Sequence, residues 1–293
     1  MILDLPLARA SLDPDAEART RPGLLEDVLA EADTAVVLVD EIGHLAVRDA
    51  ALDLIPAAEH IPPPGTVHVH LGRTASGAAR VLAIAPRDAR RDHHDLRRIM
   101  ARMTPEDLGI AVPAVAIANW HHAHRHCPRC GRATEVTAAG WVRVCRDCGL
   151  DHYPRTDPAV IMAVTDDDGR LLLAHAAHFP AGRYSMVAGY VEPGESLEHA
   201  VVRETREEVG LDVVDVTYRG SQPWPFPRSL MAAFTARVVG TPWPRADGVE
   251  ITDARFLSRA DLATAVGAGD ITLPGPASVA HSLLLDWYGG PVP

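Results

Sequence analysis

Short runs of hydrophobic residues, separated by turn residues, fill the first third of the chain and predict the strands of a sheet. There are four of these runs: TAVVLVD (34–40), HLAV (44–47), TVHVHL (66–71) and RVLAIA (80–85). A helix is predicted over DHHDLRRIMARM (92–103). We therefore expect an N-terminal α+β domain over residues 1–118, in which we find no catalytic motif.

The second half of the chain has its own pattern of apolar runs. AVIMAVTD (159–166) and RLLLAHA (170–176) predict paired strands, because the Asp168-Gly169 dipeptide between them favours a tight turn. A further strand is predicted over SLMAAFTARVV (229–239) and a final helix over residues 276–288. Residues 119–154 differ in character from both halves, so we expect a small module there and a last domain over residues 155–293.

One helix in this last domain has clear local signals. The run Leu197–Val209 predicts about three and a half turns, with Ser196 as the N-cap and Gly210 as the C-terminal stop. Three apolar residues follow helical spacing and can face a core: Leu197, Ala200 and Val201.

Composition fits a globular protein of more than one domain. The 293 residues are 47% hydrophobic and 23% charged. We find neither a membrane-spanning run nor a secretory signal, so a cytoplasmic protein without membrane contact is expected. The formal net charge of −11 argues against broad binding to nucleic acid and leaves room for a local basic patch only.

All four cysteines fall in two CxxC pairs, CPRCG and CRDCG. Four thiolates complete the tetrahedral coordination of zinc and leave no position for water, so a structural zinc ribbon over residues 119–154 is predicted. Free thiols, a disulfide or bound iron are the alternatives. The ligands are Cys127, Cys130, Cys145 and Cys148.

Several histidines also suggest metal binding. Alternation places His68 and His70 on one face of a strand, which we interpret as a solvated face rather than a metal site. Four more lie just before or at the start of the cysteine module, and we expect them at the surface because the cysteines already suffice: His121, His122, His124 and His126.

Three acidic residues crowd one edge of the predicted helix. Glu204, Glu207 and Glu208 recur at helical spacing, which is unfavourable unless a cation compensates them. Carboxylate oxygens in this arrangement suit Mg²⁺ or Mn²⁺. A solvated acidic face is the alternative, which the neighbouring glycine loop, Glu195 and Arg203 disfavour.

The whole segment resembles the Nudix box, G-x5-E-x7-R-E-U-x-E-E-x-G-U, where U is a bulky apolar residue. Thr205 departs from the pattern at a U position, which puts local packing in question. Eight residues match in place: Gly189, Glu195, Arg203, Glu204, Glu207, Glu208, Gly210 and Leu211.

This resemblance implies an αβα sandwich whose loop-helix-loop binds divalent cations and hydrolyses nucleoside diphosphates linked to another group. It implies that Glu204 and Glu208 bind the cations, that Glu207 shares their face, and that Arg203 orients the glutamates. Two more ligands are implied: the carbonyl oxygen of Ala188 and the carboxylate of Glu250.

Ten residues after the box, prolines alternate with aromatic residues in SQPWPFPRS (221–229). Proline stiffens the backbone and pre-orders the rings, which suits a stacked base, although a partner motif or plain loop packing is the alternative. The segment and the zinc ribbon together resemble the NADH pyrophosphatase branch of the Nudix hydrolases. The residues implied to line a dinucleotide site are Gln222, Pro223, Trp224, Pro225, Phe226, Pro227, Arg228, Ser229, Tyr153, Ala280 and Tyr190, the last against nicotinamide.

The predicted reaction is in-line attack of water on one phosphorus of NAD(H), giving a nicotinamide mononucleotide and AMP. Divalent cations neutralise the developing charge, and Glu207 or Glu208 accepts the proton. By resemblance, the protein is a homodimer. Removal of an NAD cap from RNA 5′ ends uses the same bond and is one rival; a non-enzymatic zinc-ribbon module that binds nucleic acid is the other.

Overall fold

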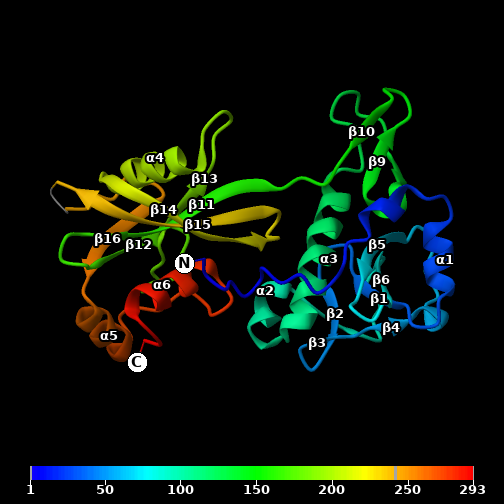
Figure 1. Ribbon diagram of the computed structural model, residues 1–293, viewed down its shortest axis with the longest axis horizontal. Coiled ribbons are helices and arrows are strands. Elements are labelled where there is room, and N and C mark those ends of the chain that lie inside the picture. The colour runs from blue at the N-terminus through cyan, green and yellow to red at the C-terminus, as the bar shows by residue number, and fades with distance from the viewer. Residues whose placement is uncertain (1, 241–242, 293) are drawn as a thin grey trace. The chain divides into compact units, whose positions relative to one another are not determined.

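The computed structural model describes residues 2–240 and 243–292 and divides the chain into two compact units (Figure 1). The carboxylate unit, which contains the predicted Nudix box, comprises Met1–Ala8, Asp157–Pro223 and Ser229–Pro293. The cysteine unit, which contains the four cysteines, comprises Arg9–Thr156 and Trp224–Arg228. The predicted boundaries at residues 118 and 154 stay predictions.

The cysteine unit is built on a sheet in which β1 and β6 are parallel, with the order β3-β2-β1-β6-β5 and with β4 on β1 and β7 on β2. The four apolar runs of the first third all form strands here, as predicted. The strands are β1 (Ala35–Val39), β2 (Leu45–Arg48), β3 (Ala51–Leu52), β4 (Ile55–Pro56), β5 (Val67–Arg73), β6 (Ala79–Ile84) and β7 (Asp92–His94).

The predicted helix over residues 92–103 is partly wrong. Its first three residues pair with β2 as β7, and α2 begins only at Leu96, where the Asp95 side chain accepts a hydrogen bond from the backbone N–H of Arg97. Before the cysteine module, the helical segments of this unit are η1 (Ala16–Thr20), α1 (Leu24–Ala30), η2 (Ala57–Glu59), α2 (Leu96–Ile99), η3 (Met100–Arg102) and α3 (Pro105–Ala123).

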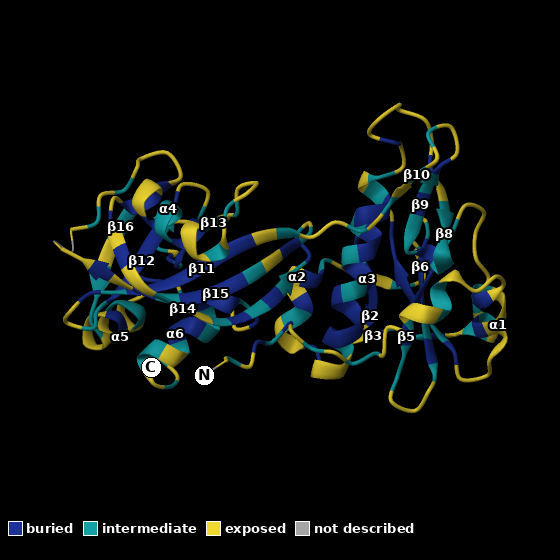
Figure 2. Ribbon diagram, turned by 45° about the horizontal axis from the view of Figure 1, so that its top comes forward, coloured by how far each residue is buried: buried dark blue, intermediate teal, exposed yellow. Residues whose placement is uncertain are grey.

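Helix α3 was not predicted, although Thr104 caps it and Pro105 occupies its first turn. Its residues are apolar on nearly every side, so the sequence lacks the polar stripe that marks a surface helix. Figure 2 shows that much of the helix is buried. It packs against β1, β3 and β5, and its end leads into the cysteine module. That module is a three-stranded antiparallel sheet of β8 (Glu135–Thr137), β9 (Val142–Cys145) and β10 (Leu150–His152), with η4 (Ala138–Gly140) between the first two strands.

The carboxylate unit contains a mixed sheet of order β14-β15-β11-β12-β16, with β13 on β11. Strands β11 and β12 form the predicted antiparallel pair, and β15 lies parallel to β11. The strands are β11 (Asp157–Thr165), β12 (Leu171–Ala176), β13 (Val187–Tyr190), β14 (Asp212–Trp224), β15 (Ser229–Val239) and β16 (Ile251–Leu257).

Helices cover both faces of this sheet. Along β11, Val160 and Met162 point into a core shared with α4 (Leu197–Val209), while Ile161 and Ala163 point into a core shared with α5 (Arg259–Ala268) and α6 (Val279–Tyr288). Burial on both faces explains why β11 is apolar throughout. The predicted αβα sandwich and the overall α+β class are confirmed.

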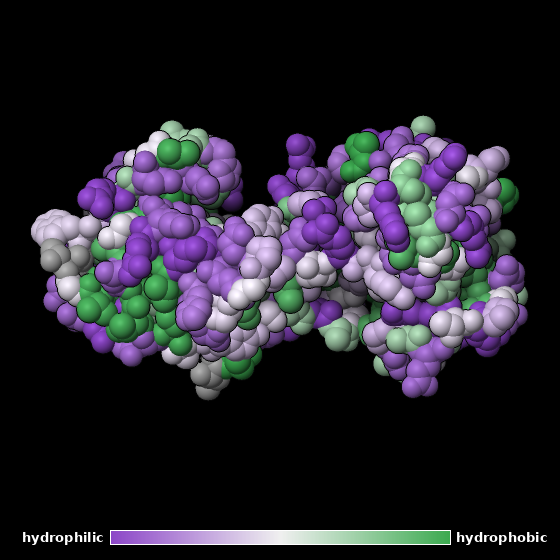
Figure 3. Space-filling view, turned by 90° about the horizontal axis from the view of Figure 1, so that it is seen from above, coloured by the Kyte–Doolittle hydropathy of each residue, from purple (hydrophilic) through white to green (hydrophobic). Residues whose placement is uncertain are grey.

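Hydrophilic and hydrophobic residues are both present on the surface of the protein. Hydrophilic residues cover much of the face in Figure 3, and hydrophobic residues gather in patches. Within the described parts of the chain, no helix is long and apolar enough to cross a membrane.

Candidate active site and zinc ribbon

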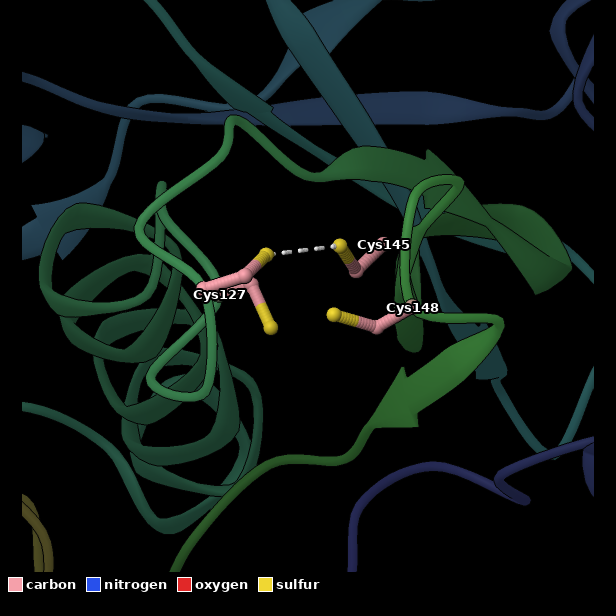
Figure 4. A group of neighbouring side chains, drawn as sticks. Cys127, Cys145 and Cys148 are labelled. Atoms are coloured by element: carbon pink, nitrogen blue, oxygen red, sulfur yellow. Dashed lines mark hydrogen bonds between the residues drawn. The ribbon is translucent and has the colours of Figure 1, made fainter.

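The four cysteines converge as predicted. Their sulfur atoms all lie within 4.8 Å of one another, and Figure 4 shows the side chains pointing toward a common centre. Each pair sits on a tight turn, closed by hydrogen bonds of 2.8 Å from Gly131 N to Cys127 O and from Gly149 N to Cys145 O. Burial acts to raise the pKa of Cys127, but backbone N–H groups outweigh it and lower the pKa to about 6. The geometry and chemistry fit a structural zinc ion.

The predicted surface position of His121 is wrong. The residue is 2% exposed, because this side of α3 packs into the unit. Its Nδ1 accepts a hydrogen bond from Arg143 at 2.8 Å, and its Nε2 donates one to the Gly140 carbonyl at 2.9 Å. Burial lowers the pKa of His121 to about 4, so the ring is neutral and structural.

The predicted solvated face of β5 is also wrong. His70 is fully buried, and its Nε2 lies 3.1 Å from the Asp15 carboxylate. The Nε2 of His68 lies 3.1 Å from that of His60. This face is covered because η4 packs on β5, and the Trp141 indole donates to the His70 carbonyl.

In the carboxylate unit, α4 has the predicted bounds. The Ser196 hydroxyl accepts a hydrogen bond from the backbone N–H of His199, and Gly210 ends the helix in the left-handed conformation at φ 69°. The departure at Thr205 is accommodated, because its buried hydroxyl donates to the Val201 carbonyl at 2.7 Å. The polar residue therefore satisfies itself within the helix.

Arg203 joins several acids of the site. Its guanidinium donates to Glu195 at 2.9 Å, to Glu204 at 2.8 Å and to Glu207 at 2.9 Å. It also donates to the Tyr190 carbonyl at 2.9 Å, which ties α4 to β13. These bonds raise the pKa of Arg203 and lower that of Glu195. The arginine thus holds the carboxylates in fixed orientations.

Glu208 is the most unusual acid of the site. It is 6% exposed, and its Oε2 is buried without a hydrogen-bond partner in the described part of the chain. Burial, and then the charges of Glu204, Glu250 and Asp247, raise the pKa of Glu208 to about 8. Burial likewise raises the pKa of Glu204. A buried carboxylate with an unused oxygen beside other acids calls for a cation.

Asp247, which was not among the predicted site residues, joins the loop that carries Glu250 to the end of α4. The Asp247 N–H donates to the Glu208 carbonyl at 3.1 Å. The Asp247 carboxylate accepts from the N–H groups of Val249 at 3.0 Å and Ile251 at 2.9 Å, which orders the turn around Glu250. The Asp-Gly dipeptide at 247–248 signalled a turn and could have identified this residue.

The proline-aromatic segment is anchored along its length. Gln222 is fully buried, accepting from Leu7 N at 2.9 Å and donating to the Ala277 carbonyl at 3.0 Å. Trp224–Arg228 belongs to the cysteine unit, where Asn119 donates to the Pro225 carbonyl at 2.9 Å.

The aromatic rings of this segment contact each other. Trp224 meets Phe226 edge to face at 5.0 Å, and the Arg97 guanidinium lies 4.4 Å from the Phe226 ring centroid. Asn119 and Arg97 lie more than 100 residues before the segment, so no local pattern indicates these contacts. These contacts fix the position of the segment in the structure, and the role of the rings toward a substrate stays a prediction.

The other predicted substrate residues differ in exposure. Tyr190 is 56% exposed with its hydroxyl 3.3 Å from that of Ser229, and Tyr153 is 62% exposed. Ala280 is buried in the core under α6. Their contacts with a substrate also stay predictions.

Comparison with known proteins agrees with this site. Residues 155–273 match the NUDIX domain, and residues 122–153 match the NADH pyrophosphatase zinc ribbon domain. The chain is 36% identical over 296 residues to the "NAD-capped RNA hydrolase NudC" of Mycobacterium tuberculosis, covering 95% of this chain and 90% of that protein. The chain belongs to the Nudix hydrolase family.

Two more Nudix proteins match a smaller part of this chain. The human "NAD-capped RNA hydrolase NUDT12" is 36% identical over 200 residues, covering 64% of this chain and 43% of that protein. The crystal structure of a Nudix hydrolase from Nitrosomonas europaea is 21% identical, with a TM-score of 0.45, and covers 56% of this chain and 90% of that one.

The Nudix box of this chain fits a divalent cation. A Cβ atom built on Gly189 would lie 1.9 Å from Cδ of Glu204, so the glycine leaves the space that this carboxylate fills. Glu204, Glu208 and Glu250 offer oxygen atoms, which hard cations prefer. Among the described residues, the four cysteines are the group of His, Cys, Asp or Glu side chains whose ligand atoms already lie together, within 4.8 Å of one another.

Proposed function

We propose that this Nudix hydrolase cleaves the pyrophosphate bond of NAD(H) to give a nicotinamide mononucleotide and AMP. The observation that carries the proposal is the buried, unpartnered oxygen of Glu208 beside Glu204 on α4. The zinc ribbon of the NADH pyrophosphatase type supports this choice of substrate, and so does the mycobacterial relative named as an NAD-capped RNA hydrolase.

Mg²⁺ or Mn²⁺ would be held by Glu204, Glu208, Glu250 and the Ala188 carbonyl. When bound, such cations neutralise pyrophosphate charge and make water more acidic. Arg203 keeps Glu204 in place through its 2.8 Å hydrogen bond, so the carboxylate needs little reorganisation on binding.

The proton of the attacking water goes to a glutamate of α4. Glu207 is the more accessible candidate, since its side chain is 61% exposed. Its Oε2 accepts a hydrogen bond from Arg203, which orients the carboxylate. Glu208 is the buried candidate, and its raised pKa favours a proton in the absence of a cation. The pH-rate profile of Glu207→Gln separates the two roles: loss of the limb that reports the general base assigns the base to Glu207, and an unchanged profile assigns it to Glu208.

For the substrate, Tyr190 is proposed to stack on nicotinamide, since its ring is exposed and its backbone is fixed by Arg203. The other lining residues are proposed as predicted from the sequence, namely Tyr153, Ala280 and the segment 222–229. A homodimer and a cytoplasmic location are part of the same proposal.

The decisive experiment incubates the purified chain with NADH and Mg²⁺ or Mn²⁺, and identifies the products chromatographically. Metal-dependent release of AMP is expected, with none from Glu208→Gln. Absence of AMP with either metal would reject NAD(H) hydrolysis, and absence of AMP from NAD-capped RNA as well would favour a non-enzymatic zinc-ribbon module.

A second candidate function is removal of the NAD cap from RNA 5′ ends, which the similarity to two NAD-capped RNA hydrolases favours. Measuring kcat/KM on NADH and on a short NAD-capped RNA, under the same salt conditions, decides between the two. A preference for RNA that falls steeply with salt indicates phosphate contacts along a strand.

A further inference from the structure

A cavity of about 450 Å³ lies within the cysteine unit. Its walls are partly apolar, from Val67 and Ile84 on neighbouring strands. Cavities of this size hold small organic molecules in many proteins. Its lining also includes cationic and histidine side chains, so its chemistry is not that of a plain packing gap.

Arg143 lines this cavity and is only 7% exposed. Its guanidinium donates to the Thr134 hydroxyl at 2.7 Å, to the Thr134 carbonyl at 3.1 Å and to His121 Nδ1 at 2.8 Å. All these acceptors are neutral, and no carboxylate pairs with Arg143 in the described residues. A buried guanidinium that lacks a counter-charge is costly, and an anion in the cavity would relieve that cost.

Two more groups point to the same ligand chemistry. Arg125 also lines the cavity, is exposed, and forms no ion pair within residues 2–240 and 243–292. His122 also lines it, and its Nε2 is buried without a hydrogen-bond partner in the described structure. The acid in the lining, Glu41, already accepts a hydrogen bond from the Arg87 N–H at 2.8 Å. The lining of the cavity therefore contains two arginines and a histidine nitrogen without a hydrogen-bond partner, but only one carboxylate, and that carboxylate already accepts a hydrogen bond.

We propose that this cavity binds the oxyanion group of a small organic phosphate or carboxylate, with Arg143 and Arg125 as its cationic partners. The apolar wall formed by Val67 and Ile84 takes the body of the ligand. All residues of this site belong to the cysteine unit, and none is an α4 carboxylate. It is therefore a separate site, additional to the one proposed to hydrolyse the pyrophosphate.

The competing explanation is that the arginines only balance the charge of the zinc-thiolate cluster. Arg143 is two residues from Cys145, and Arg125 is two residues from Cys127. In that case, substituting either arginine weakens zinc retention. Anion binding is then either absent already in the wild type or the same in the variants as in the wild type.

The test titrates the zinc-loaded full chain calorimetrically, without Mg²⁺ or Mn²⁺, with inorganic phosphate, AMP, citrate and adenosine. Binding of AMP or citrate, but not of adenosine, is expected, because adenosine lacks the oxyanion. AMP against citrate distinguishes a phosphate from a carboxylate ligand. No binding of any of these anions at millimolar concentration would overturn the proposal.

Variants then place the binding in this cavity. Arg125→Gln should weaken binding at least fivefold while zinc content and NADH turnover stay at wild-type levels. Arg129→Gln is the matched control, since Arg129 is exposed in the same ribbon but does not line the cavity. Arg143→Gln should abolish binding, with zinc content checking that the variant is folded.

Three results would contradict the site. If Arg125→Gln binds the anion as tightly as the wild type does, Arg125 is not a partner of the anion. If Arg129→Gln weakens anion binding as much as Arg125→Gln does, the anion is attracted by the positive surface in general and not by this cavity. Loss of zinc from the arginine variants without a change in anion affinity supports charge balance at the cluster instead.

Discussion

Substituting Gly189 by alanine should disable the proposed cation site without unfolding the protein. The new Cβ would lie 1.9 Å from Cδ of Glu204, and ordinary contact begins at 3.4 Å, so the carboxylate must move by at least 1.5 Å (3.4 − 1.9). Misplacement by about 1 Å costs ~100-fold in rate, or about 2.7 kcal/mol of activation free energy. We therefore expect kcat on NADH to fall ~100-fold or more and Mn²⁺ to bind more weakly.

Stability should change little, because the displaced group is the end of a flexible side chain. The main loss is the Arg203–Glu204 hydrogen bond, worth about 1 kcal/mol in a partly exposed position, or roughly 2–4 °C in melting temperature. The matched control is Gly267→Ala, where the added Cβ meets nothing within 4 Å. Wild-type turnover and Mn²⁺ affinity in Gly189→Ala would refute the assignment of Glu204, and a collapse in melting temperature would refute the steric argument.

Three further predictions test the site and the ribbon. Glu208→Gln should abolish AMP release, since an amide cannot replace the carboxylate as a cation ligand, while circular dichroism stays unchanged. Removing zinc with a chelator should unfold the ribbon, detected as increased proteolysis between residues 122 and 153, because so small a module depends on the metal for folding. The buried neutral His121, with a pKa of about 4 against 6.5 unfolded, should stabilise the fold fully above pH 6.5 and lose up to ~3 kcal/mol as pH falls toward 4.

Each of these predictions has its control. Undiminished turnover in Glu208→Gln would remove the catalytic assignment, and unchanged proteolysis after zinc loss would make the metal dispensable. For the histidine, the unfolding free energy of His121→Gln should depend less on pH than that of the wild type. Acid also protonates the cysteine thiolates in both proteins, so the role of His121 is measured by the difference between their unfolding free energies at each pH. A difference that does not change with pH would contradict the role of His121.

The sequence alone determined the features that depend on neighbouring residues. Helix α4 has the predicted bounds because Ser196 and Gly210 satisfy its ends within a few residues. The zinc ribbon followed from two CxxC turns, each of which places two sulfurs by local geometry. The parallel pairing of β11 with β15 joins segments far apart in the chain, so no local pattern encodes it. Helix α3 lacked a clear signal because a helix that is apolar on nearly every side has no polar stripe.

Tertiary structure decided which side chains are buried, and burial sets their chemistry. It placed His70 and His121 inside the fold, where the pattern of the chain indicated solvent. It left one oxygen of Glu208 buried and unpartnered, and it brought Asp247 from a distant loop to the end of α4. Hydrogen bonds between segments far apart in the chain depend on packing, which no local pattern of residues encodes.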